Sequence, residues 1–135
     1  MADFVFFYGT LMTPFNRPGR QRVTPQMSFV GRGTIRAALF DLGIYPAAVP
    51  SHDGRTVSGE VYELLDPPVV LAVLDEIEGY RAAEPERSLY TRVLTDVALD
   101  DGENLEAWAY FYNAPLGRAQ RIASGDYLEH LSVKG

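Results

Sequence analysis

The sequence predicts an α+β fold: a strongly bent sheet or a small closed β-barrel with flanking helices. Three observations lead to this class. Short apolar or alternating runs typical of strands recur along the chain, one stretch with helical spacing lies between them, and two strand-like runs joined by a polar turn follow it. Strands that do not alternate regularly with helices favour an α+β domain. The 135 residues suit a single domain, 1–135, with its own core.

The first third of the chain is expected to hold two strands and a loop. Asp3 to Tyr8 is a nearly continuous apolar run, as in a strand that is buried on both faces. Pro14 to Pro25 is rich in proline and arginine and also contains Asn16, so it indicates an exposed loop or a short irregular helix. Ser28 to Phe40 has strand character, and its two glycines suggest a bulge or sharp bend.

The middle third is expected to hold a short extended piece, a strand and the main helix. Asp41 to Pro50 is proline-rich and reads as an ordered loop with a short extended piece, whereas Thr56 to Leu64 alternates as a strand does. Asp66 is expected to cap a helix that starts with two prolines and stops at Gly79. The helix has apolar residues at i, i+3, i+4 and i+7, which predicts one buried face: Val70, Val73, Leu74 and Ile77.

The last third is expected to hold a hairpin and short helices. Leu89 to Leu99 and Leu105 to Tyr112 read as strands joined by a polar turn at Asp100 to Asn104. Arg118 to Ser124 is expected to form a short helix, and a final helical turn or two is expected from Ser124 through Leu131.

Composition excludes several classes of function. A net charge of −6 argues against a nucleic-acid partner or an anionic membrane surface, and no apolar run is long enough to span a bilayer. The chain has no cysteine and two histidines, which argues against thiol nucleophiles and histidine-rich metal sites. The N-terminus lacks the basic region of a signal peptide. We therefore expect a cytoplasmic protein with no metal and no cofactor.

The turn after the first strand is a candidate anion site. The strand ends at Tyr8, and Gly9-Thr10 follow before the hydrophobic pattern resumes at Leu11. Several backbone N–H groups there lack partners in a sheet, and such a set of donors can hold a carboxylate. The alternative is structural: Tyr8 is a core aromatic whose hydroxyl bonds to the backbone.

Three acids crowd the C-terminal turn of the predicted helix: Asp75, Glu76 and Glu78. The helix dipole disfavours anions there, and Asp75 and Glu78 form a like-charge i, i+3 pair. Both effects raise carboxyl pKa values, which favours proton transfer near neutral pH. The alternative is that all three acids are solvated and serve solubility.

Five segments of the chain follow one another in a fixed order within one domain. They are Tyr8-Gly9-Thr10-Leu11, Gly43-Ile44-Tyr45-Pro46-Ala47, Gly59-Glu60-Val61-Tyr62, Leu74-Asp75-Glu76-Ile77-Glu78-Gly79-Tyr80 and Tyr90-Thr91-Arg92. In this order and spacing the chain resembles the γ-glutamylcyclotransferase-like superfamily, which includes γ-glutamylamine cyclotransferases and the AIG2-like proteins of plants. The resemblance implies a small, nearly closed barrel with flanking helices.

The resemblance also implies site residues. The glutamate directly before glycine, Glu78 and not Glu76, matches the family's catalytic acid/base. The substrate-binding positions match the turn and two strand tyrosines: Tyr8, Gly9, Thr10, Leu11, Tyr90 and Tyr110. Tyr112, two residues after Tyr110, is expected on the same side of its strand.

The implied chemistry is release of an amine or amino acid from a small γ-glutamyl substrate, with ring closure to 5-oxoproline. Such a lyase or acyl-transfer step is intramolecular, so it needs positioning and one proton-transfer group. Two alternatives stay open: an enzyme for γ-glutamylamines, and a non-catalytic module that binds a small ligand. The arginines of the loop are expected to be solvated, with contact to an acidic substrate tail as the alternative: Arg17, Arg20 and Arg22.

Overall fold

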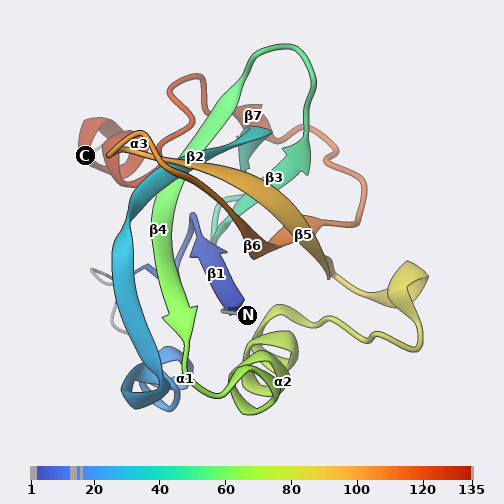
Figure 1. The fold of residues 1–135 in the computed structure, drawn as a ribbon. Helices are drawn as coiled ribbons and strands as arrows, with labels where there is room; N and C mark the ends of the chain where they lie inside the picture. The colour runs from blue at the N-terminus through green and yellow to red at the C-terminus, as the bar shows by residue number, and fades with distance from the viewer. Residues whose placement is uncertain (1–2, 13–14, 16, 135) are drawn as a thin grey trace.

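A five-stranded closed barrel forms the body of the protein. The computed structural model describes residues 3–12, 15 and 17–134. Strands β1 (Asp3–Phe7), β2 (Met27–Asp41), β4 (Thr56–Leu64), β5 (Tyr90–Leu99) and β6 (Asn104–Tyr112) are hydrogen-bonded in the order β2-β4-β1-β6-β5. A short pairing of β2 with β5 closes the ring (Figure 1). The predicted α+β class with a small barrel and flanking helices is confirmed.

Strand β2 is long enough to serve two sheets. Its first part pairs with β4, and the register shifts between Phe29 and Gly31, which confirms the predicted bulge. Its last part leaves the barrel and pairs with β3 (Pro46–Pro50) on one side and β7 (Gln120–Arg121) on the other. The short extended piece predicted before Pro50 is therefore β3.

The short helix predicted over Arg118 to Ser124 is wrong. This segment contains β7, and the Ile122 N–H donates to the Leu39 carbonyl at 2.7 Å. Pairing with β2, which is distant in sequence, overrides the local preference. The last helix is confirmed as α3 (Tyr127–Lys134), and the Asp126 carboxylate caps it by accepting from the N–H groups of Leu128 and Glu129 at 3.0 and 3.2 Å.

Helix α2 (Pro67–Glu78) carries the acidic turn. Asp66 occupies the N-cap position, but its side chain makes no capping hydrogen bond, so its predicted capping role is wrong. Gly79 ends the helix in the left-handed conformation with φ 67°, as predicted. The N–H groups of Gly79 and Tyr80 donate to the carbonyls of Glu76 and Asp75 at 3.3 and 2.9 Å, which satisfies the last turn.

The proline-rich segment after β1 forms short helices, α1 (Pro18–Gln21) and a 3₁₀ turn, η2 (Thr24–Gln26), so the short-helix alternative holds. Pro14 and Asn16 of this segment lie outside the described residues. Arg20 is buried, contrary to expectation, and its guanidinium lies 4.7 Å from the centroid of the Tyr62 ring.

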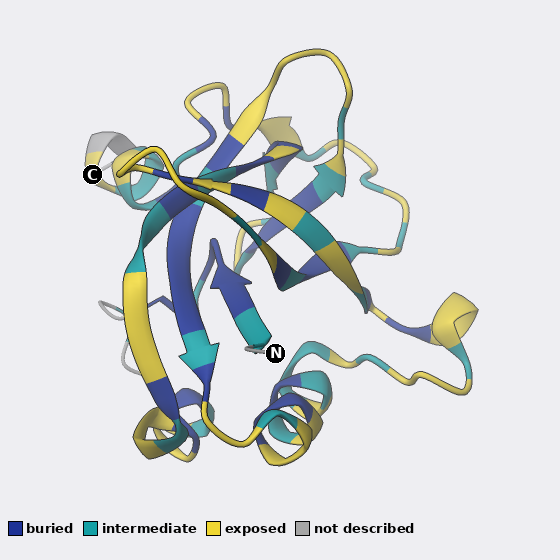
Figure 2. Cartoon of the chain, viewed as in Figure 1, coloured by how far each residue is buried: buried dark blue, intermediate teal, exposed yellow. Residues whose placement is uncertain are grey.

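The core fills the barrel and extends beneath α1 and α2. Strands β1 and β4 are its most buried elements, and the start of β2 is exposed on its outer side (Figure 2). On α2, the predicted residues Val70 and Leu74 are buried, whereas Val73 and Ile77 are partly buried and pack against the core. Leu71, which the helical spacing did not single out, is also buried. A further 3₁₀ turn, η3 (Pro85–Arg87), lies between α2 and β5. No helix in the described ranges is long and apolar enough to cross a membrane.

Candidate active site

All seven residues that the sequence nominates line one pocket. The cavity has a volume of about 100 Å³ and lies where the end of β1, the start of β3, the end of α2 and the start of β5 meet. Its lining consists of Phe6, Phe7, Tyr8, Gly9, Thr10, Leu11, Arg17, Tyr45, Pro46, Ile77, Glu78, Leu89, Tyr90 and Tyr110. Of the aromatic residues on β6, only Tyr110 lines this pocket, and Tyr112 does not.

The turn after β1 lines this pocket and contains backbone donors without acceptors in the described residues. The Met12 N–H donates to the Gly9 carbonyl at 3.0 Å, which closes the turn. Within the described part of the chain, no residue accepts a hydrogen bond from the N–H groups of Gly9, Thr10 or Leu11. A Cβ at Gly9 would lie 2.8 Å from Cγ of Pro46, so only glycine lets β3 approach this closely.

The Tyr8 hydroxyl bonds to the protein itself. It donates to the Tyr110 carbonyl at 2.6 Å and accepts from the Ala48 N–H at 3.3 Å. Burial raises the pKa of this phenol well above its ordinary range, and the charge of Glu78 adds to the effect. The structural alternative for Tyr8 is therefore confirmed: its hydroxyl joins β1, β3 and β6 at the pocket wall.

The hydroxyl groups of Tyr90 and Tyr110 also donate hydrogen bonds to other residues of the protein. The Tyr90 hydroxyl donates to the Pro46 carbonyl at 2.9 Å, and the Tyr110 hydroxyl donates to Oδ1 of Asp75 at 2.7 Å. Burial raises the pKa of both phenols above the usual range, so both are neutral. Both residues line the pocket, and their oxygens, having donated their protons, keep lone pairs that can accept a hydrogen bond.

Glu78 is the acid of the last turn of α2 that faces the pocket. Burial raises its pKa from 4.5 to about 7, and the nearby positive charge of Arg17 opposes this shift. The dominant cause is loss of water rather than the helix dipole or the like-charge neighbour that the sequence suggests. A carboxyl group with this pKa exchanges a proton readily near neutral pH.

The other two acids of that turn have different surroundings. Glu76 is exposed, as the solvated alternative predicts. Asp75 is not free in solvent: its carboxylate accepts from Nε of Arg92 at 2.9 Å and from the Tyr110 hydroxyl. The alternative in which all three acids are solvated is thus wrong for Asp75 and Glu78.

Several pocket residues were not predicted as site residues. Arg17 lines the pocket, donates to Oγ1 of Thr10 at 2.8 Å and is exposed, as predicted for the loop arginines; contact with an acidic substrate tail stays a prediction. Ile77 and Leu89 add apolar wall. No local signal distinguishes them, because only the folded chain brings α1, α2 and the start of β5 together. Pro46 lies in a segment that carries the family resemblance.

Comparison with known proteins identifies the family. The family model described as gamma-glutamyl cyclotransferase, AIG2-like matches residues 5–129. The gamma-glutamylcyclotransferase family protein YtfP of Escherichia coli K12 is 31% identical over 126 residues, which cover 93% of this chain and 96% of YtfP. The solution structure of Escherichia coli YtfP matches with a TM-score of 0.66 over 94% of this chain and 97% of that one.

Other solved structures share the fold. YkqA from Bacillus subtilis has a TM-score of 0.73 at 24% identity; the match covers 99% of this chain but 42% of YkqA. An AIG2-like protein from mouse has a TM-score of 0.63 at 23% identity, with 84% of this chain and 80% of that chain covered. Because the family model and YtfP both match over most of its length, the chain belongs to the gamma-glutamyl cyclotransferase, AIG2-like family.

Proposed function

We propose that the protein is a cyclotransferase that releases an amine or amino acid from a γ-glutamyl donor and forms 5-oxoproline, with Glu78 as the general acid/base. The observation that carries the proposal is the placement of Glu78. Its carboxyl group, with a pKa raised to about 7, shares a pocket with the open turn from Tyr8 to Leu11.

The reaction balances within one substrate molecule. The α-amine nitrogen attacks the γ-carbonyl carbon, the new C–N bond closes the five-membered ring, and the C–N bond to the leaving amine breaks. The α-ammonium group loses two protons on its way to the lactam N–H; Glu78 accepts them one after the other and passes both to the departing nitrogen, which leaves as an ammonium ion. No electrons are transferred and no water is consumed, so binding in a near-attack conformation and one proton shuttle suffice.

The pocket offers complementary groups for both ends of the glutamyl unit. The N–H groups of Gly9, Thr10 and Leu11 suit the α-carboxylate, because they are backbone donors without acceptors in the described part of the chain. The hydroxyl oxygens of Tyr90 and Tyr110 suit the α-ammonium group or the amide N–H, because their own protons are already donated to Pro46 and Asp75.

The test is a panel of γ-glutamyl amino acids and γ-glutamylamines with detection of 5-oxoproline. We expect the wild-type protein to turn over at least one donor. Glu78→Gln is expected to lower kcat by 100-fold or more while donor binding persists, because removing a general acid/base typically costs 10²- to 10⁴-fold. Glu76→Gln is the matched control: it changes the same chemical group two residues away, where the side chain is exposed.

The panel also tests the alternative. If no donor is turned over while a donor or 5-oxoproline still raises the melting temperature, the protein is a ligand-binding module of the same fold. If Glu76→Gln and Glu78→Gln lower kcat equally, the assignment of Glu78 as the proton-transfer group fails. Within the panel, the better class of donor identifies the leaving group.

A further inference from the structure

A partly buried polar cluster adjoins the pocket on the side of α2. Its centre is the carboxylate of Asp75, which accepts three hydrogen bonds. Nε and one terminal nitrogen of Arg92 donate to its two oxygens at 2.9 and 3.3 Å, and the Tyr110 hydroxyl donates at 2.7 Å. The side chains of Asp75 and Arg92 are 19% and 18% exposed, so this bidentate pair is well shielded from solvent.

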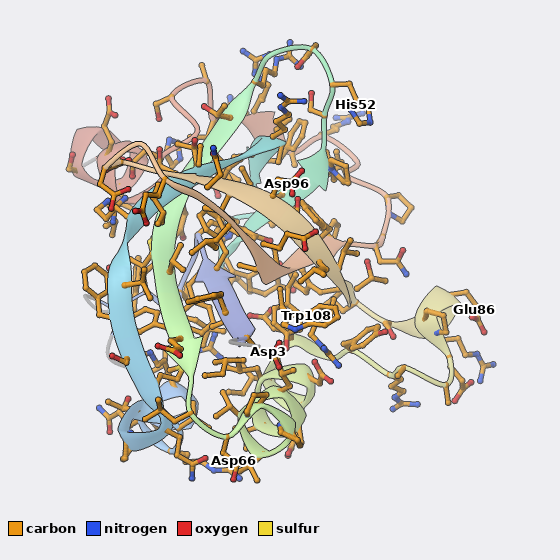
Figure 3. The ribbon with its side chains drawn as sticks, in the orientation of Figure 1. Asp3, His52, Asp66, Glu86, Asp96 and Trp108 are labelled. Atoms are coloured by element: carbon orange, nitrogen blue, oxygen red, sulfur yellow. The ribbon has the colours of Figure 1, made fainter. Side chains whose placement is uncertain are left out.

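Aromatic rings hold Arg92 in place. Its guanidinium carbon lies 4.6 Å from the centroid of Trp108 and 5.7 Å from that of Tyr80. Trp108 extends from β6, and Tyr80 lies two residues after the end of α2. The labelled Trp108 lies between the strands and α2 in the view of Figure 3. Arg92 therefore ties the end of α2 to the hairpin of β5 and β6.

The register of the hairpin explains why one carboxylate reaches both partners. Arg92 and Tyr110 are directly opposite each other in the pairing of β5 with β6, so their side chains leave the same face. Asp75 lies three residues before Glu78 on α2, and residues with this spacing are neighbours on one side of a helix. The anchored residue and the proton-transfer residue thus belong to the same helical turn.

We propose that Asp75 and Arg92 are positioning residues for the cyclisation: their pair directs the Tyr110 hydroxyl proton away from the pocket and fixes the turn of α2 that carries Glu78. The inference rests on the proposed function. Because the Asp75 carboxylate accepts the proton of Tyr110, the phenol oxygen is left as an acceptor for the ammonium group of the substrate. Without Asp75 the phenol is free to rotate, and a donor then faces that cation.

A double-mutant cycle tests the link between Asp75 and Tyr110. We expect Asp75→Ala and Tyr110→Phe each to lower kcat by about 10-fold, while the double variant is no slower than the slower single variant, because both changes remove the hydrogen bond between Tyr110 and Asp75. Losses that multiply in the double variant would contradict the proposal. So would an unchanged kcat for Asp75→Ala with only a lower melting temperature.

Titration of Glu78 by carboxyl NMR provides a readout independent of turnover. Arg92→Lys keeps the charge but loses the two parallel hydrogen bonds. We expect the pKa of Glu78 to fall by about one unit in this variant, toward its ordinary value, because a loosened helix end admits water. The groups that act on Glu78 from the packed elements are unchanged: Arg17, Tyr8, Tyr90 and Tyr110. An unchanged pKa would refute the positioning role.

Failure of the proposed function and failure of the positioning role give different experimental results. If the wild-type protein forms 5-oxoproline from no donor, the proposed function fails, and the Glu78 titration still decides whether Asp75 and Arg92 position the turn. The matched control is Arg87→Lys, which weakens an exposed pair with Glu84 at 3.2 Å, outside the pocket. We expect this variant to change neither kcat nor the pKa of Glu78.

Discussion

At the scale of single residues, burial decides which acid of one helical turn can exchange a proton near neutral pH. Glu76 and Glu78 have the same side chain and lie two positions apart, but Glu76 is exposed and Glu78 faces a pocket. Loss of water raises the pKa of Glu78 to about 7. The same burial makes its ionised form costly, so the group that suits the chemistry also lowers the stability of the fold.

This cost predicts a pH-dependent gain of stability in Glu78→Gln. The folded-state pKa of about 7 exceeds the ordinary value of 4.5, so the folded protein holds more protons than the unfolded chain between these pH values. Stability therefore falls as pH rises through this window. We expect Glu78→Gln to be more stable than the wild-type protein above pH 7, by up to about 3 kcal/mol, with the difference vanishing below pH 4.5.

Urea unfolding at a series of pH values measures this difference. Glu76→Gln is the control, because it makes the same chemical change at an exposed position. A constant difference between Glu78→Gln and the wild-type protein at all pH values would contradict the assignment of the raised pKa to Glu78.

At the scale of elements, the pocket depends on how closely β3 approaches the turn after β1. Gly9 lies against the ring of Pro46, whose carbonyl in turn accepts from Tyr90. The wall of the pocket is therefore continuous from β1 through β3 to β5. Each contact is short, so a change of one methyl group is sufficient to disturb it.

We expect Gly9→Ala to lower stability by roughly 1–3 kcal/mol and to weaken donor binding, because its Cβ would force Pro46 out of place. Gly31→Ala is the matched control, because a Cβ there meets no atom within 4 Å. Urea unfolding and a binding titration of both variants check this prediction. Equal effects of the two substitutions would show that the close approach at Gly9 has no particular importance.

Local sequence patterns predicted those elements whose signal is local. The apolar face of α2 and the stop at Gly79 are readable because helix spacing and a left-handed cap are properties of neighbouring residues. β7 was missed because its strand character comes from pairing with β2, which is far away in sequence. The seven predicted site residues share a pocket, but Arg17 and the pair of Asp75 with Arg92 needed the folded chain to bring their elements together.

At the scale of the whole molecule, the closed barrel makes the site one rigid arrangement. The pocket takes residues from β1, β3, α2, β5 and β6, and the barrel strands among them are joined by continuous pairing around the ring. Closure leaves the barrel strands few free edges that can move apart. The positions of the turn and of Glu78 are thus fixed by the same core.

Unfolding is therefore expected to be a single cooperative transition for residues 1–135. Trp108 is the only tryptophan in the sequence, and it contacts Arg92 next to the end of α2. Its fluorescence reports on the region of the site, whereas far-ultraviolet circular dichroism reports on all helices and strands. We expect both signals to change at the same urea concentration. Two separate midpoints would contradict a single cooperative domain.

The acceptor-lined pocket wall also bears on the fate of the product. Tyr90 and Tyr110 both direct their hydroxyl protons into the protein, so their oxygens attract a cation. Under the proposed reaction, ring closure converts the charged α-ammonium group into the neutral N–H of a lactam. In this proposal ring closure removes the charge by which these oxygens would hold the substrate, and we expect 5-oxoproline to leave readily and inhibit weakly.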